Sequence, residues 1–313
     1  MKRVLKRVAI GLAVFLILGI SGLAIAVAVR QNRTFDAPYP DIHASTDPAV
    51  IERGRYLVTG PAHCTACHAL ASDHGKAEPH LAGGFAFELP IGTIYARNIT
   101  PDEHTGIGRY SDKEIARVLR YGVHPSGRAM LPFMPFNDMA DDDLTAVISY
   151  LRSRPAIDHA VPASDFNLLG RFAKAFLVEP VGPSHAPAAH ANPAQTAEYG
   201  GYIANTIANC GGCHTRRSLR TGEQLGVAFA GGMEMESHTQ PGTTFVTPNL
   251  TPDPASGHLT AWTEDQFVAR FRNAVETPSP MPWSSFKNLT DDDLRALYRY
   301  FRSLPPVMKG QAI

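Results

Sequence analysis

The sequence is poor in cysteine and lacks the patterns of several common functions. Its 313 residues include four cysteines, and its 29 basic residues are balanced by 29 acidic ones. A chain without net charge gives no indication of a nucleic-acid partner or of a polybasic membrane patch. We find no Ser-His-Asp arrangement, phosphate-binding loop or paired carboxylates, so the sequence nominates no catalytic residue. All the cysteines fall in two short motifs, which leaves none for a disulfide.

Each pair of cysteines belongs to a C-x-x-C-H pentapeptide. This pattern is typical of covalent haem c attachment, in which two thiols bond to the haem vinyl groups and the histidine ligates the iron. A redox dithiol or half of a zinc site would need only C-x-x-C, so the histidine and the duplication favour haem. We therefore expect two covalently bound haem c groups. The predicted attachment residues are Cys64, Cys67, Cys210 and Cys213, with His68 and His214 as iron ligands.

The N-terminus combines a basic start with a long uncharged run. Four Lys and Arg residues precede Val8–Val29, a stretch that would form a helix about 33 Å long, enough to cross a bilayer. The apolar region of a secretory signal is usually shorter, which favours a retained anchor, although Ala26-Val27-Ala28 leaves cleavage open. The basic residues predict that the remainder is exported. We expect a bacterial inner-membrane protein with both haem domains in the periplasm.

The rest of the chain consists of two copies of one sequence pattern. Gly54 and Tyr56 precede the first motif as Gly200 and Tyr202 precede the second, at an offset of 146 residues. Glycine is unfavourable inside a helix, so we expect these glycines to contact the C-terminal helix of their own copy. The pattern predicts a membrane anchor or signal (1–30), an extended tether (31–46), a first domain (47–155), a linker (156–191), a second domain (192–306) and a tail (307–313).

Local signals predict helices at equivalent places in both copies. Each copy begins with an N-cap residue before proline, contains a capping box, and closes with a helix after three aspartates. Apolar residues at i, i+3, i+4 and i+7 give the closing helices one buried face. With helices predicted at equivalent places in both copies, the expected fold class is all-α. The predicted caps are Asp47 and Asn192, then Ser111 and Thr263.

Each copy also contains a methionine followed by proline and an aromatic residue. Met134 and Met281 follow their motif histidines by 66 and 67 residues, a spacing that Met130 and Met139 do not match. A thioether is a soft ligand, and iron held by His and Met has both axial positions filled, as electron carriers require. Methionine among aromatics is also common core filler. The repeated motif and spacing favour Met134 and Met281 as ligands.

Other polar residues remain as weaker candidates. Four histidines compete for the axial positions, but His124, for example, has no counterpart in the second copy. Several donors could bind haem propionates, and turn or capping roles account for the same residues equally well. The competing histidines are His104, His124, His238 and His258, and the propionate candidates are Arg97, Asn98, Thr100, Tyr110, Asn249, Thr251 and Trp262.

Further repeated blocks complete a family resemblance. N-[IL]-T-P-D-x-x-x-G sequences begin at Asn98 and Asn249, and D-D-D-L helices follow the methionines. With the other motifs, over about 47–306, they resemble the membrane-anchored cytochrome c subunits of bacterial periplasmic alcohol and gluconate dehydrogenases. The resemblance implies two tandem class I cytochrome c domains after an N-terminal transmembrane helix, with haem on the matching cysteines. The chain departs from that family in having two such domains where the family has three.

The resemblance implies a function as well as a fold. We expect a diheme c-type cytochrome that relays electrons between a periplasmic dehydrogenase and a quinone, soluble cytochrome or terminal oxidase. It would be a non-catalytic electron-transfer protein or the electron-transfer subunit of a dehydrogenase, with redox proteins and the membrane as partners. The alternative is a peroxidase-like diheme enzyme with one open haem site. A haem-based sensor would call for a signalling module, and the sequence contains no recognisable one.

Overall fold

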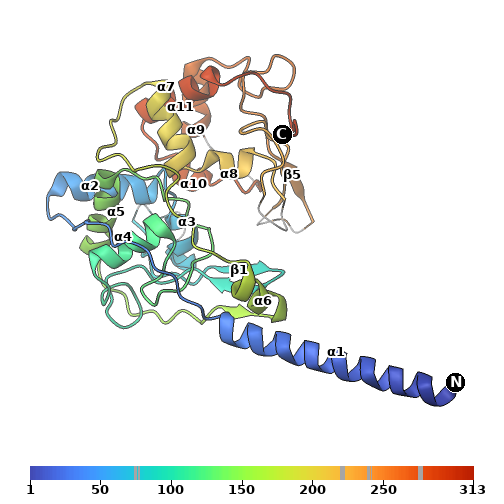
Figure 1. Ribbon diagram of the computed structural model, residues 1–313. Coiled ribbons are helices and arrows are strands. Elements are labelled where there is room, and N and C mark those ends of the chain that lie inside the picture. The colour runs from blue at the N-terminus through green and yellow to red at the C-terminus, as the bar shows by residue number, and fades with distance from the viewer. Residues whose placement is uncertain (74–75, 77, 219–222, 238–239, 241, 274–277) are drawn as a thin grey trace.

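The computed structural model of the protein is mainly helical, with one long helix that stands apart from the rest (Figure 1). It describes residues 1–73, 76, 78–218, 223–237, 240, 242–273 and 278–313. The long helix α1 (Lys2–Arg30) is exposed along nearly its whole length, and its length and apolar character suffice to cross a membrane. The other elements, in chain order, are α2 (Pro48–Thr59), α3 (Thr65–His68), the 3-10 turn η1 (Ala71–Asp73), β1 (Ala86–Leu89), β2 (Gly92–Tyr95), α4 (Asp112–Tyr121), α5 (Asp141–Ser153), β3 (Asp165–Phe166), α6 (Leu168–Phe176), α7 (Ala197–Tyr202), the π-helical turn η2 (Ile203–Ile207), α8 (Cys210–His214), β4 (Glu234–Glu236), β5 (Thr244–Val246), α9 (Glu264–Arg272), α10 (Trp283–Phe286) and α11 (Asp291–Ser303).

Buried apolar side chains form two clusters. The first is built mainly from α2, α4 and α5 and includes Leu57 and Ile148. The second is built mainly from α7, α9 and α11 and includes Phe267 and Leu297. The two helical groups lie next to each other, with α3 and α10 between them (Figure 1). Each C-x-x-C-H motif begins beside its own apolar cluster, because its first cysteine packs against that cluster.

Glycine allows the first and last helices of each copy to touch. A Cβ on Gly54 would lie 1.9 Å from the carbonyl oxygen of Ala146 in α5. A Cβ on Gly200 would lie 2.0 Å from the carbonyl oxygen of Ala296 in α11. No side chain fits at such a distance unless the helices separate. The expectation that each glycine contacts the last helix of its own copy is confirmed.

The helix before the second motif begins later than predicted. Asn192 is not its N-cap, because α7 begins at Ala197 and the Thr196 hydroxyl caps it. The Gln195 side-chain amide donates to the Asp292 carboxylate of α11 at 2.8 Å, which holds this segment against α11 outside the helix. The other predicted caps, at Asp47, Ser111 and Thr263, are confirmed.

The all-α expectation is incomplete, because a small antiparallel sheet follows each motif. β1 pairs with β2 in the register Ala86↔Tyr95, and β3 adds to the other edge of β2. β4 pairs with β5 in the register Glu234↔Val246. These strands have two to four residues, too few for a period-two pattern to stand out in the sequence.

The segment expected as a tether is extended but packed against the first half. The Phe35 N–H donates to the carbonyl of Gly127 at 2.7 Å. The Arg117 guanidinium of α4 donates to the carbonyl of Ala37 at 3.0 Å, and Ile42 is buried in the first cluster. Residues 31–46 thus hold the first half close to the end of α1.

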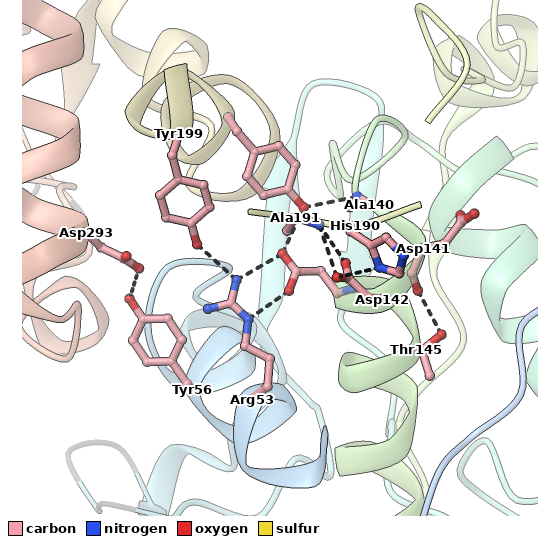
Figure 2. Close-up of polar contacts among 12 residues, drawn as sticks. Arg53, Tyr56, Ala140, Asp141, Asp142, Thr145, His190, Ala191, Tyr199 and Asp293 are labelled. Atoms are coloured by element: carbon pink, nitrogen blue, oxygen red, sulfur yellow. Dashed lines mark hydrogen bonds and ion pairs between the residues drawn. The ribbon is translucent and has the colours of Figure 1, made fainter. Parts of the chain in front are cut away.

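Two tyrosines connect the two halves through a reciprocal pair of hydrogen bonds, and Figure 2 shows the one between Tyr56 and Asp293. Tyr56 of α2 donates to Asp293 of α11, and Tyr202 of α7 donates to Asp143 of α5 at 2.9 Å. The tyrosines occupy equivalent positions in the repeat, and so do the aspartates. Each tyrosine therefore binds the closing helix of the other copy. Each hydroxyl also accepts a backbone N–H at the start of that helix, from Thr290 at 3.3 Å and from Ala140 at 3.0 Å respectively.

The two aspartates differ in their charge partners. Arg53 donates two hydrogen bonds to Asp143, at 2.8 and 3.1 Å, and a third to the Tyr199 hydroxyl. Tyr199 occupies the position in the second copy that Arg53 occupies in the first. Within the described part of the chain, no Arg or Lys forms an ion pair with Asp293. Burial raises the pKa of Asp293 above its usual 3.8, and the hydrogen bond from Tyr56 is the largest of the interactions that oppose this rise, ahead of the charge of Arg53.

Alanine at either interhelical glycine should destabilise the protein. Gly54→Ala and Gly200→Ala should each lower the free energy of unfolding by about 1–3 kcal/mol, because the added methyl forces two packed helices apart. Gly19→Ala in α1 is the matched control, since nothing lies within 4 Å of the added carbon. Unfolding of the detergent-solubilised protein followed by circular dichroism measures the difference. A stability equal to that of the control would contradict the close contact.

Removing the two tyrosine hydroxyls should have unequal, pH-dependent effects. At pH 7 Tyr56→Phe should lower the free energy of unfolding by about 1.5–3 kcal/mol, and Tyr202→Phe by about 0.5–1.5 kcal/mol, because Arg53 still binds Asp143. As the pH falls through the raised pKa of Asp293 towards 3.8, the folded protein takes up a proton there and the charged carboxylate disappears. The loss in Tyr56→Phe should then shrink. Equal losses in both variants at both pH values would refute this prediction.

Candidate haem-attachment sites

Each C-x-x-C-H motif forms a short helical turn. In the first, the backbone N–H groups of Cys67 and His68 donate to the carbonyl of Cys64 at 3.3 and 2.9 Å. Residues three and four apart on a helix lie on the same side, so the two thiols and the imidazole face one region. A non-glycine residue with a left-handed backbone precedes each motif: His63 (φ 40°) and Asn209 (φ 49°). These equivalent kinks turn the chain sharply into the motif.

A backbone carbonyl orients each motif histidine. Nδ1 of His68 lies 2.7 Å from the carbonyl oxygen of Arg97, and Nδ1 of His214 lies 3.0 Å from that of Pro248. The proton therefore resides on Nδ1, which donates, and Nε2 keeps a free lone pair. Burial lowers the pKa of both imidazoles, which favours the neutral form that binds metal. Both histidines therefore keep Nε2 free to accept, as the predicted iron ligation requires.

The N-[IL]-T-P-D blocks hold these carbonyls in place. Asn98 follows Arg97 directly, is 2 % exposed, and donates to the carbonyl of Ile157 at 2.8 Å. Asn249 follows Pro248 in the same way and donates to the carbonyl of Val307 at 2.7 Å. Each asparagine also accepts two hydrogen bonds from the threonine two residues later. Protein groups thus satisfy these asparagines and threonines, which favours a structural role for these propionate candidates.

The remaining propionate candidates also have protein partners. The Arg97 side chain donates to the carbonyl oxygens of Val161 and Pro162 at 3.0 and 2.8 Å. The Tyr110 hydroxyl accepts a hydrogen bond from Arg109 at 2.9 Å. The Trp262 ring packs against that of His258, and its backbone carbonyl accepts from Tyr298. The donor groups of Tyr110 and Trp262 therefore stay weaker propionate candidates, outside the predicted site.

The environment of the thiols fits haem better than the alternative chemistries. Each cysteine is half-buried and unpaired. Burial raises the pKa of Cys64 and Cys210 to about 12, whereas a redox dithiol needs a lowered pKa. In the described residues no three His, Cys, Asp or Glu side chains gather closely enough to hold a metal ion, which argues against a zinc cluster. Thiols at the edge of an apolar cluster, beside an oriented histidine, suit a large apolar ring.

The methionines selected by spacing lie at the edges of the two apolar clusters. Met134 is partly buried and packs on the first cluster, as Cys64 does. Met281 is partly buried and packs on the second cluster, as Cys210 does. Met139 is 1 % exposed within the first cluster, so it fills the core. The structure thus brings each selected methionine and its motif to the same cluster.

The competing histidines have other contacts or lie on the surface. His124 Nδ1 interacts with the Ser126 hydroxyl at 2.8 Å, and its ring packs edge-on against Tyr110. The His258 ring lies 5.2 Å from that of Trp262. His104 is exposed, and His238 lies outside the described residues.

Sequence reasoning missed the groups that position the motif histidines. Those groups are backbone carbonyls, at Arg97 and Pro248, and a carbonyl has no side-chain signature. The left-handed residues His63 and Asn209 were also missed, because neither is a glycine. Their equivalent positions directly before each motif are the signal that could have revealed them.

Comparison with known proteins finds cytochrome c sequences similar to this chain. Residues 49–151 match the family model of cytochrome c oxidase, cbb3-type, subunit III. The cytochrome c subunit of a quinone-dependent alcohol dehydrogenase from Gluconacetobacter polyoxogenes is 33 % identical over 284 residues, covering 85 % of this chain and 58 % of that protein. The gluconate 2-dehydrogenase cytochrome c subunit of Pantoea cypripedii is 33 % identical over 273 residues, covering 82 % of this chain and 60 % of that protein.

A relative of similar length is also found. A diheme c-type cytochrome from Cereibacter sphaeroides is 26 % identical over 310 residues, covering 95 % of this chain and 97 % of that protein. This chain spans about three fifths of the dehydrogenase subunits that it matches. Residues 49–151 thus match a cytochrome c family, and the chain is similar to the cytochrome c subunits of bacterial alcohol and gluconate dehydrogenases.

Proposed function

We propose that this chain is a membrane-anchored diheme cytochrome c that relays electrons between a periplasmic dehydrogenase and a quinone, a soluble cytochrome or a terminal oxidase. Two tandem class I cytochrome c domains, 47–155 and 192–306, would each hold one haem c. The observation that carries the proposal is the repeated site: a C-x-x-C-H turn whose histidine Nδ1 is bound to a backbone carbonyl. Each half supplies, in addition, a methionine at the matching spacing.

The proposed sites divide the chemistry between cofactor and chain. When bound, haem c supplies reversible one-electron chemistry at iron. The chain fixes the tautomer of each motif histidine, and Met134 and Met281 would supply the second iron ligand of each haem. With histidine and methionine both bound, no position would remain for peroxide, which favours a relay over the peroxidase-like alternative. The first site comprises Cys64, Cys67, His68 and Met134, and the second comprises Cys210, Cys213, His214 and Met281.

The two sites touch each other through the chain. The imidazole of His63, directly before the first motif, packs edge-on against Phe286 with ring centroids 5.4 Å apart. The hydroxyls of Thr65 and Ser285 are 3.2 Å apart. Both partners belong to α10, which begins two residues after Met281. Contact between one attachment motif and the methionine segment of the other supports electron passage within one chain.

The relatives and the N-terminal helix support the remaining parts of the proposal. The relatives named as dehydrogenase subunits support a dehydrogenase as electron donor. The diheme relative, covered over 97 % of its length, supports two haem groups. Basic residues before the apolar part of α1 favour a cytoplasmic N-terminus and periplasmic haem domains, with α1 as the inner-membrane anchor.

Met281→Ala tests the proposed ligation. The variant should keep its haem through Cys210 and Cys213, but the potential of one haem should fall by on the order of 0.1 V, because the thioether is lost. The reduced variant should also bind carbon monoxide at the opened position. Met308→Ala is the matched control, since Met308 is 66 % exposed. Redox titration and carbon monoxide difference spectra measure both effects, and a titration identical to that of the control would overturn the assignment.

A further inference from the structure

Helix α6 carries an exposed apolar stripe that the proposed electron relay does not explain. Leu168, Leu169 and Phe172 are 82 %, 56 % and 36 % exposed. Helical spacing places them on one side together with Phe176, whose ring lies 5.1 Å from that of Phe172. Exposed apolar side chains that adjoin on one helix face mark an interaction surface.

The opposite side of α6 is packed on the protein. A Cβ on Gly170 would lie 2.1 Å from the carbonyl oxygen of Ile91, in the turn between β1 and β2. The helix is thus fixed to the first half on the Gly170 side, while Leu168, Leu169 and Phe172 of the stripe and the neighbouring Arg171 are exposed.

Contacts with the end of α1 fix the level of α6 relative to a membrane. Nε of Arg30 donates to the carbonyl oxygen of Ala175 at 3.4 Å, and the Arg30 guanidinium lies 5.3 Å from the Phe176 ring. Nη2 of Arg33 donates to the carbonyl oxygen of Val178 at 2.7 Å. The apolar run of α1 ends at Arg30, and α6 lies beside that end in Figure 1. A bilayer that surrounds α1 would therefore have its surface at α6.

The charges around α6 match an anionic lipid surface. The nine residues of α6 include two basic side chains, Arg171 and Lys174, and no acidic one. Arg30 and Arg33 add two more positive charges at the end of α1, with Glu179 3.5 Å from Arg33. Basic residues beside a stripe of Leu and Phe are typical of helices that lie in the membrane interface.

We propose that α6 lies flat in the membrane interface beside α1, with Leu168, Leu169 and Phe172 inserted among the lipid acyl chains. Such helices place their apolar face about 5–10 Å into the boundary between headgroups and acyl chains. With α1 this gives the first half two attachments to the bilayer, so it cannot turn freely about the anchor. The inference rests on the proposed membrane anchor and adds a lipid-binding surface to it.

Cysteine accessibility in the full haem-loaded chain tests the inference. Leu169→Cys and Phe172→Cys are reconstituted in nanodiscs of phosphatidylcholine and phosphatidylglycerol and treated with a charged, membrane-impermeant maleimide. Leu225→Cys is the matched control, since Leu225 is 39 % exposed in the second half. Maleimide attacks the thiolate, which apolar surroundings disfavour, so labelling at both α6 positions should be at least about tenfold slower than at position 225. The unsubstituted chain gives the background rate, and unchanged haem spectra confirm that each variant is folded.

Two further variants decide between the outcomes. Ile17→Cys in α1 should be protected if the anchor spans the bilayer. Protection at position 17 together with control-like labelling at position 169 would overturn the α6 inference and leave the anchor intact. Ready labelling at position 17 would overturn both the membrane anchor and the α6 inference.

Arg171→Cys lies outside the stripe and should react as fast as Leu225→Cys. Equal slowing at position 171 would mean that α6 is covered on all sides, as by a protein partner, and would overturn a lipid contact.

Discussion

The arrangement of the two halves depends on a reciprocal pair of buried tyrosine–aspartate hydrogen bonds. Tyr56 reaches Asp293 in the closing helix of the second copy, and Tyr202 reaches Asp143 in that of the first. A buried carboxylate without a donor is strongly unfavourable, so Asp293 gains from the Tyr56 hydroxyl of the other copy, whereas Asp143 also accepts hydrogen bonds from Arg53 of its own copy. Because α2 and α7 lead directly into the two motifs, this interaction also brings the first motif against α10, next to Met281.

The proposed haem sites combine sequence motifs with backbone geometry. The pentapeptides supply the thiols and imidazoles, while the carbonyls of Arg97 and Pro248 determine which imidazole nitrogen is free. Asn98 and Asn249 hold those carbonyls by binding the segments that follow α5 and α11. The orientation of each candidate ligand is therefore coupled to the complete fold of its half. Helix α6 in turn couples the first half to the proposed membrane anchor, because the end of α1 is hydrogen-bonded to it and to the residues that follow it.

The repeat made much of the fold predictable. The offset of 146 residues identified Gly54 and Gly200 as interhelical contacts, since a helix interior disfavours glycine unless another backbone lies close to it. The strands were not predicted, because two to four residues show no clear alternation. The start of α7 was misplaced because the tertiary contact of Gln195 with Asp292 overrides the local capping signal at Asn192. The contact of each tyrosine with the closing helix of the other copy could not be predicted either. A repeat shows which residues are equivalent, but it does not show which copy each side chain contacts. The selection of Met134 and Met281 as ligands stays a prediction.

We infer that both haem groups are six-coordinate, with histidine and methionine as ligands, and that they serve to carry electrons. The most direct test is the carbon monoxide difference spectrum of the fully reduced, unsubstituted protein, recorded alongside its haem content. We expect two haem groups per chain and no spectral change on adding carbon monoxide, because a closed site leaves no position for it. Carbon monoxide binding to either haem of the native protein would contradict this claim and favour the peroxidase-like alternative.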